Sequence, residues 1–440
     1  MRKQYVILAA IFTMSLCFTA CKDDPIAVTE LTLDKTTLTL FEGETETLTV
    51  AVLPDNTTNK KAHWYSSNTN VATVDKNGKI TALAKGFTVI TAICEEKSAT
   101  CKVTVCLELD SGTTGDLSWI FADDGTLFIR GNGEMPDYEF DVELTAPWET
   151  YQNTIETLII DSGVTNIGNF AFYECNILKN ITIPNSLTSI GDNAFYSCTS
   201  LTDITLPNSL KNIGNSAFSY CSGFTSINIP NNVTRIGEWA FTFCSNLMSI
   251  TIPKSVTSIG EGAFYYCIRL TSIAIPDGTL SIENWTFQQC SRLTNIIIPN
   301  SITSIGTEAF RNCNSLKSII IPNSVTSIGA GAFYNCGSLV DINIPNGMTS
   351  IESSTFIYCG DLKGIIIPNS VASIGSSAFW GCRSLTEITV ETKLPPDVYG
   401  SGCFYNVNRS IPVYVPQESL QAYKDAPVWK EFTNLQGKEF

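Results

Sequence analysis

The chain has 440 residues, which is enough for two or three domains. Hydrophobic residues make up 44% of it, so a large core can be buried, whereas charged residues make up only 16%. The formal net charge of −15 argues against nucleic acid as a partner and against a long groove for phosphates.

The first twenty residues have the pattern of a secretory signal peptide. Arg2 and Lys3 form a basic start, and the apolar stretch from Tyr5 to Phe18 is too short to span a bilayer comfortably. The run Phe18-Thr19-Ala20-Cys21 then resembles a lipobox, the motif in which the cysteine is acylated and becomes the new N-terminus. The following Lys22-Asp23-Asp24 resembles the acidic surface-export signal of lipoproteins in the Bacteroides group.

Cys21 is therefore the predicted lipidation site, and residues 21–25 are the predicted tether. The alternative is ordinary cleavage after residues 1–20, which would leave Cys21 as a free cysteine. No second hydrophobic span occurs in the sequence, so we expect membrane attachment through lipid alone, at the outer membrane and the cell surface.

Residues 26–106 have the pattern of an all-β sandwich. Short runs that alternate apolar and polar positions, such as Leu48/Val50/Val52, are separated by turn signals such as Asn77-Gly78. The stretch from His63 to Asn68 and the run Val71-Ala72-Thr73-Val74-Asp75 resemble the bacterial Ig-like group 2 domain, and the resemblance covers the whole unit.

Cys94 and Cys101 flank a short polar run in this unit. A hairpin turn at Lys97-Ser98 would set the two residues opposite each other, so the alternatives are a cross-strand disulfide and two free thiols.

Residues 107–160 and 391–440 do not keep the repeat of the segment between them, and we expect them to form its N-terminal and C-terminal caps. The first of these carries strand signals at Leu117 to Phe121 and at Leu127 to Arg130, on either side of a turn.

Residues 161–390 contain a 23-residue repeat. In each copy a cysteine lies three residues after the repeated phenylalanine. A leucine lies six residues after the same phenylalanine in every copy but one. The repeated phenylalanines are Phe172, Phe195, Phe218, Phe241, Phe264, Phe287, Phe310, Phe333, Phe356 and Phe379.

The consensus A-F-x-x-C-x-x-L-x-x-I-x-I-P-x-x-V-x-x-I-G predicts one coil of a leucine-rich-repeat solenoid. The L-x-x-I-x-I segment supplies inward side chains on a short parallel strand, and proline ends that strand. Ala-Phe-x-x-Cys is predicted to form a short helical or 3-10 turn on the outer side. One coil cannot bury its own apolar face, so the coils must stack.

The stretch from Ile321 to Cys336 resembles the BspA-like leucine-rich-repeat family, and the resemblance extends over about residues 108–435. Members of that family are bacterial surface proteins, several of them associated with adhesion. The resemblance implies a scaffold that presents a binding surface, with a ligand that varies among members.

The sequence offers no catalytic, cofactor or metal site. His63 is the single histidine of the chain, so no Ser-His-Asp or Cys-His set can be assembled around the repeats. Stacked cysteines point their Cβ atoms in parallel, whereas a disulfide needs them to converge, so we expect buried, reduced thiols. Thiolates along an apolar core also match no zinc spacing.

Two surfaces are candidates for binding. The first is formed by the outward residue of each strand, where Ile297, Ile320 and Ile366 lie in the C-terminal half with Lys317 and Lys363 beside them. The alternative is that isoleucine merely suits a strand.

The second surface is an aromatic ledge next to the repeated phenylalanines. Aromatic rings of this kind suit protein or sugar partners, but they can also pack against each other. The ledge comprises Tyr220, Trp239, Phe243, Tyr265, Tyr266 and Trp285.

The leading hypothesis is an adhesin-like surface protein that binds a host or microbial protein through the solenoid, with the Ig-like unit as a spacer. The alternative is a glycan-binding surface protein for nutrient capture, in which the ledge dominates. A purely structural surface component is a third hypothesis, and nothing in the sequence favours an enzyme.

Overall fold

The computed structural model describes residues 26–140 and 144–440. The predicted signal peptide, the predicted lipidation site Cys21 and the predicted tether therefore lie outside the described residues. The chain divides into two compact units, of which the first ends at Leu107 and the second begins at Glu108. Within the described residues, no helix has both the length and the apolar character needed to cross a membrane.

The first unit is an all-β sandwich, as predicted. One sheet has the order β2-β9-β8-β5, a second has the order β3-β7-β6, and β1 pairs with β4. Ile90 and Val103 from the first sheet share a buried cluster with Ala72 and Ile80 from the second, so the core lies between the two sheets. The strands are β1 (Glu30–Leu33), β2 (Thr37–Phe41), β3 (Thr45–Thr47), β4 (Val50–Leu53), β5 (His63–Ser66), β6 (Ala72–Val74), β7 (Lys79–Ala82), β8 (Gly86–Cys94) and β9 (Lys97–Cys106).

The β8–β9 hairpin bears on the two alternatives for Cys94 and Cys101, a disulfide or two free thiols. The turn lies at Glu95-Glu96, two residues before the predicted position, so Cys94 pairs with Lys97 and Cys101 pairs with Ile90. Both cysteines are free, and they are buried in two different hydrophobic clusters. The shifted turn therefore moves the two thiols out of register, and no disulfide joins them.

The second unit begins with an antiparallel cap that turns into a parallel sheet. β10 (Glu108–Thr114), β11 (Leu117–Ala122) and β12 (Thr126–Gly133) pair in order, and β12 then pairs in parallel with β13 (Thr157–Ile160). Trp148, just before the 3-10 turn η1 (Glu149–Tyr151), is buried and its indole nitrogen donates to the Ala171 carbonyl at 2.7 Å. This cap covers the apolar end of the first coil.

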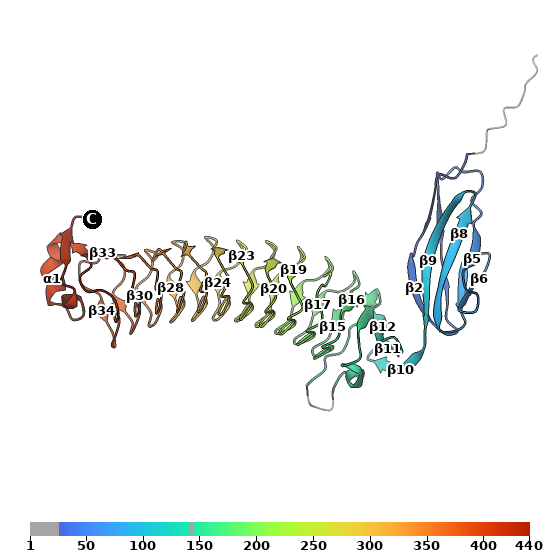
Figure 1. The fold of residues 1–440 in the computed structure, drawn as a ribbon, viewed down its shortest axis with the longest axis horizontal. Helices are drawn as coiled ribbons and strands as arrows, with labels where there is room; N and C mark the ends of the chain where they lie inside the picture. The colour runs from blue at the N-terminus through green and yellow to red at the C-terminus, as the bar shows by residue number, and fades with distance from the viewer. Residues whose placement is uncertain (1–25, 141–143) are drawn as a thin grey trace, which may run out of the picture. The chain divides into compact units, whose positions relative to one another are not determined.

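Most coils of the solenoid contribute one strand to each of two ladders, and each ladder is a series of short parallel sheets along the solenoid (Figure 1). Partners are one repeat apart, as in Ser226 with Ser249. The first ladder carries the outward residues of interest, and we call its surface the strand face. Its strands are β16 (Asn180–Thr182), β19 (Ser226–Asn228), β21 (Ser249–Thr251), β23 (Ser272–Ala274), β25 (Asn295–Ile297), β27 (Ser318–Ile319), β29 (Asp341–Ile342), β31 (Gly364–Ile367) and β33 (Glu387–Val390).

The second ladder consists of two-residue strands on the returning segment of each coil, and β14 (Gly163–Val164) precedes it and pairs with β12. Most of these strands have the sequence Ser-Ile, with the isoleucine buried. They are β15 (Asn166–Ile167), β17 (Ser189–Ile190), β18 (Asn212–Ile213), β20 (Arg235–Ile236), β22 (Ser258–Ile259), β24 (Ser281–Ile282), β26 (Ser304–Ile305), β28 (Ser327–Ile328), β30 (Ser350–Ile351), β32 (Ser373–Ile374) and β34 (Asp397–Val398).

The outer segment of each coil differs from the predicted helical or 3-10 turn. Trp239 and Phe243 each have a φ of 56°, in the left-handed region, and Tyr220 and Tyr266 in the adjacent coils also have positive φ values. The backbone N–H groups of this segment donate to carbonyl groups of the next coil: Trp239 to Glu261, Phe241 to Ala263 and Phe243 to Tyr265, at 2.8–2.9 Å. The outer segments thus form a third ladder between coils, whereas a helix would satisfy these groups within one coil.

The repeated phenylalanines form one column of stacked rings in the core. Consecutive ring centroids are 5.3–5.8 Å apart from Phe172 to Phe404. Trp148 stacks on Phe172 at 5.6 Å, and Trp429 packs against Phe404 at 5.5 Å, so a buried tryptophan closes each end of the column.

Trp429 belongs to the C-terminal cap, which covers the last coil. The cap sheet adds β35 and β36 in parallel beyond β33, and the single α-helix of the described residues packs beside them (Figure 1). The elements are β35 (Val413–Pro416), η2 (Gln417–Ser419), α1 (Leu420–Asp425), η3 (Trp429–Glu431) and β36 (Leu435–Lys438).

We predict that Phe264→Ala lowers the free energy of unfolding by about 3–5 kcal/mol, because it removes a fully buried ring and leaves a cavity between two others. The exposed Leu280→Ala should change this free energy by less than about 0.5 kcal/mol. Urea denaturation followed by circular dichroism measures both. Equal losses in the two variants would contradict the central role of the column.

Candidate binding surfaces

The side chains that could hold a metal ion or act as a base do not gather at one place in the part of the chain that the structure describes. No group of three or more His, Cys, Asp or Glu residues there could hold a metal ion. His63 lies at the start of β5 in the Ig-like unit, on an exposed position. The candidate sites are therefore surfaces, and the buried cysteine column must first be accounted for.

The cysteines of the repeats are free and buried, and those from Cys198 to Cys382 act as hydrogen-bond donors. From Cys198 to Cys382, every thiol donates to the carbonyl oxygen of the repeated phenylalanine in the preceding coil, with sulfur–oxygen distances of 3.1–3.3 Å. Alanine or valine at the cysteine position would occupy the core but could not donate this hydrogen bond. The column therefore links neighbouring coils, which gives it a structural role.

Burial also holds these thiols in the protonated form. It raises the pKa of Cys175, Cys336 and Cys382 to about 12, from an ordinary value of 9.0. The reactive form of cysteine is the thiolate, so these side chains are not available as nucleophiles or as metal ligands near neutral pH.

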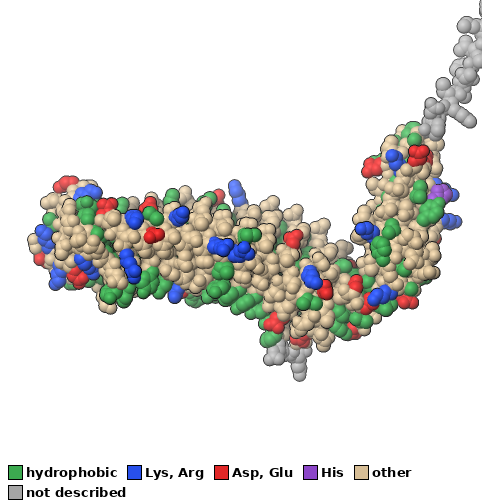
Figure 2. Space-filling model, in the orientation of Figure 1, with side chains coloured by type: hydrophobic (Ala, Val, Ile, Leu, Met, Phe, Trp, Pro, Cys, Tyr) green, Lys and Arg blue, Asp and Glu red, His purple; other side chains and the backbone are tan. Residues whose placement is uncertain are grey.

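The strand face has an exposed apolar region in its C-terminal half. The exposed fractions are 62% for Ile297, 81% for Ile320 and 55% for Ile366. Lys317 and Lys363 are also exposed. Over most of the visible solenoid, by contrast, the surface is uncharged and polar (Figure 2).

A groove of about 700 Å³ lies on the strand face over the last coils. Its lining includes Ile366 and Lys363, which the sequence analysis named, and Asp341, Glu387 and Lys438, which it missed. Lys438 comes from β36 in the C-terminal cap, so its position could not follow from the repeat. Asp341 and Glu387 could have been noticed in the sequence, because most other coils have Ser or Asn at this position.

Rings of the aromatic ledge pack mainly against each other. Tyr220 stacks on Phe243 at 4.5 Å, Phe243 contacts Tyr266 at 4.7 Å, and Trp239 meets the edge of Tyr265 at 5.7 Å. These contacts occupy ring faces that a sugar would need for stacking. They support the packing alternative for the ledge.

Trp239 also stacks on Trp285, which is two coils away, with ring centroids 5.8 Å apart. The coil between them has Gly262 at the equivalent position. A Cβ atom there would lie 2.2 Å from the Trp239 ring, so the indole occupies the space of the missing side chain. The stacking of Trp239 on a ring two coils away thus depends on the missing side chain of Gly262.

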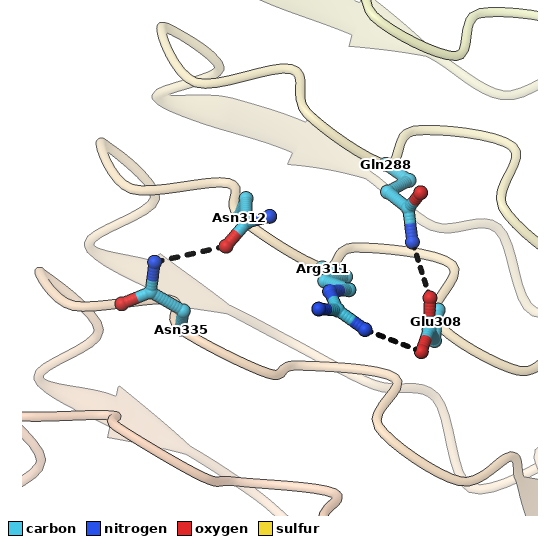
Figure 3. A network of polar contacts seen from close by, with 5 residues as sticks. All are labelled: Gln288, Glu308, Arg311, Asn312 and Asn335. Carbon is cyan, nitrogen blue, oxygen red and sulfur yellow. Dashed lines mark hydrogen bonds and ion pairs between the residues drawn. The ribbon is translucent and has the colours of Figure 1, made fainter.

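A polar network interrupts the ledge beyond Trp285 (Figure 3). Glu308 accepts hydrogen bonds from Gln288 and from Arg311, the latter at 2.6 Å, and the Arg311 guanidinium lies 4.4 Å from the centroid of the Tyr334 ring. The charges are paired within the network, so it offers no free charge to a ligand. Between the next pair of coils, the side-chain amide nitrogen of Asn335 donates a hydrogen bond to the side-chain oxygen of Asn312 at 2.8 Å.

Comparison with known families matches both units. Residues 150–268, 213–337 and 303–426 match the family described as "BspA type Leucine rich repeat region (6 copies)". Residues 27–105 match "Bacterial Ig-like domain (group 2)". Together these matches cover both the sandwich and the coils.

A solved leucine-rich repeat protein from Bacteroides ovatus is similar to this chain, with 27% identity and a TM-score of 0.50, and it covers 74% of this chain and 100% of its own. An uncharacterized protein of Clostridium acetobutylicum is 39% identical over 23% of this chain and 12% of its own length. A kappa-carrageenase of Pseudoalteromonas carrageenovora is 38% identical over 20% of this chain and 22% of its own. The chain thus spans only a small part of these two curated relatives.

We predict that the solenoid loses stability steeply above pH 9. A thiol with a raised pKa keeps its proton in the folded state, whereas the unfolded state releases it above the ordinary value of 9.0. Stability is therefore fully present below pH 9 and falls between pH 9 and about 12, by about 1.4 kcal/mol per pH unit for each such thiol.

Urea midpoints measured by circular dichroism from pH 7 to pH 11 test this expectation. A variant with Cys244, Cys267 and Cys290 changed to Ala should be less stable at pH 7 but should decline less steeply above pH 9. An unchanged slope would show that the thiols do not cause the decline.

Proposed function

This chain belongs to the BspA-type leucine-rich-repeat family, and on that premise we propose that its solenoid binds a protein partner, of host or microbial origin, at the cell surface. The predicted lipid on Cys21 would attach the chain to the outer membrane, and the Ig-like unit would act as a spacer. Binding, and not catalysis, is the proposed activity of the coils.

The observation that carries this proposal is the exposed isoleucine set on the strand face, Ile297, Ile320 and Ile366. Strand propensity alone does not require isoleucine, because threonine also suits strands and occupies the same coil position at Thr182 and Thr251. Isoleucine at these exposed positions leaves apolar surface in water. A partner that covers it would gain about 25 cal/mol for each Å² removed from water.

A glycan-binding ledge is the alternative function, and it has less support. The rings that would bind sugars are stacked on each other, from Tyr220 through Trp285. The likeness to a kappa-carrageenase covers only 22% of that enzyme, so neither its activity nor its substrate is proposed for this chain.

We predict that changing Ile297, Ile320 and Ile366 to Ser lowers saturable binding to a protein array at least tenfold, because the apolar contact is lost. A matched control changes Leu280 and Leu394 to Ser, since both are exposed but lie outside the strand face. The control should bind like the unchanged protein.

The same proteins are applied to a glycan array. Glycan binding that survives the triple substitution, together with no protein binding, would overturn the proposal and move the site to the aromatic ledge.

A further inference from the structure

Gly364 on the strand face has no explanation in the fold of its coil. It is the first residue of strand β31, and glycine is disfavoured in strands. All other coils have a side chain at this position. Those residues are Asn180, Asp203, Ser226, Ser249, Ser272, Asn295, Ser318, Asp341 and Glu387.

The usual structural reasons for a glycine do not apply here. Gly364 does not have a positive φ, and the pairing of β31 with β33 runs without a bulge from Gly364 to Ile367. A Cβ atom at Gly364 would lie 3.6 Å from the Glu387 side chain and 4.0 Å from its carbonyl oxygen, and both are ordinary contacts. By comparison, a Cβ atom at Gly375 would lie 2.4 Å from the Ser353 backbone.

A glycine inside a strand can also mark a place where another molecule comes close to the backbone. Gly364 lines the groove on the strand face, and Asp341 and Glu387 line it in the coils on either side. No residue in the described ranges forms an ion pair or hydrogen bond with either carboxylate. Two strand steps separate them, which is roughly 9.6 Å along the solenoid.

Cations and apolar groups complete the groove. The ammonium group of Lys438 lies over the Tyr414 ring, 5.3 Å from its centroid, and Lys363 is next to Gly364 in the chain. Glu391 is a third carboxylate of the lining. Ile366 and Val340 are exposed beside it, so an aliphatic group can pack there while a positive charge meets the carboxylates.

We propose that the gap at Gly364 receives an arginine side chain of the protein partner, between Asp341 and Glu387, with a neighbouring aliphatic residue on Ile366. A planar guanidinium carries donors on both edges, so it can serve two carboxylates at once, which a single ammonium group does less well. This inference rests on the proposed function, because it specifies what the strand face binds.

The test uses peptides selected from a random displayed dodecapeptide library on the full-length protein, then synthesised and measured by titration. Gly364→Val fills the gap, and valine suits a strand, so the thermal midpoint should stay equal or rise. Ser226→Val is the matched control, since it makes an equivalent change at the same coil position in β19. A second variant combines Asp341→Asn with Glu387→Gln.

We expect the selected peptides to share an arginine next to an aliphatic residue. Their affinity should fall at least tenfold for Gly364→Val and for the carboxylate variant, and it should stay unchanged for Ser226→Val. Binding should also weaken as the salt concentration rises, because the contact is between charges.

Peptides without a basic residue, or peptides that bind Gly364→Val as well as the unchanged protein, would overturn this inference. If those peptides still lose binding when Ile297, Ile320 and Ile366 are changed to Ser, the strand-face function stands and only the arginine site falls. If no selected peptide loses binding in the Gly364→Val, carboxylate or isoleucine variants, both the arginine site and the strand-face function would be contradicted.

Discussion

The fold depends on one contact that recurs along the solenoid, the stacking of a buried phenylalanine ring on the ring of the next coil. A single coil has no second apolar face of its own, so its core side chains leave water only when neighbours stack on it. The three ladders of hydrogen bonds and the thiol donors repeat with the same period. Stability is thus shared between neighbouring coils, and Trp148 and Trp429 replace the missing neighbour at the two ends.

This arrangement leaves the outward positions free to vary, because neither the ring column nor the ladders use those side chains. The ledge and the strand face nevertheless differ in how far their outward side chains are covered. On the ledge, rings such as Tyr220 and Phe243 cover each other. On the strand face, Ile297 and Ile320 remain uncovered, although threonine would serve the strand equally well. The surface that still lacks a partner is the better candidate for binding one.

The repeat made most of the fold predictable, because a 23-residue period fixes which residues of successive coils become neighbours. Two local features could not be predicted in this way. Non-glycine residues such as Trp239 carry no sequence signal for a left-handed conformation, so the outer turns were expected to be helical. The hairpin turn at Glu95-Glu96 involves no glycine or asparagine, and its position sets Cys94 and Cys101 out of register, which leaves the alternative of two free thiols. The candidate groove was only half predictable, because Lys438 reaches it from outside the repeat.

The buried cysteines have a consequence for how the chain must be made. The ten cysteines of the repeats, from Cys175 to Cys382, form no disulfide, and they are buried by the stacking of the coils. In an exported chain, any partly stacked intermediate would expose thiols spaced 23 residues apart to an oxidising compartment. Disulfides formed at that stage would hold coils out of register. The yield of native protein would therefore depend on whether the coils stack faster than the thiols oxidise.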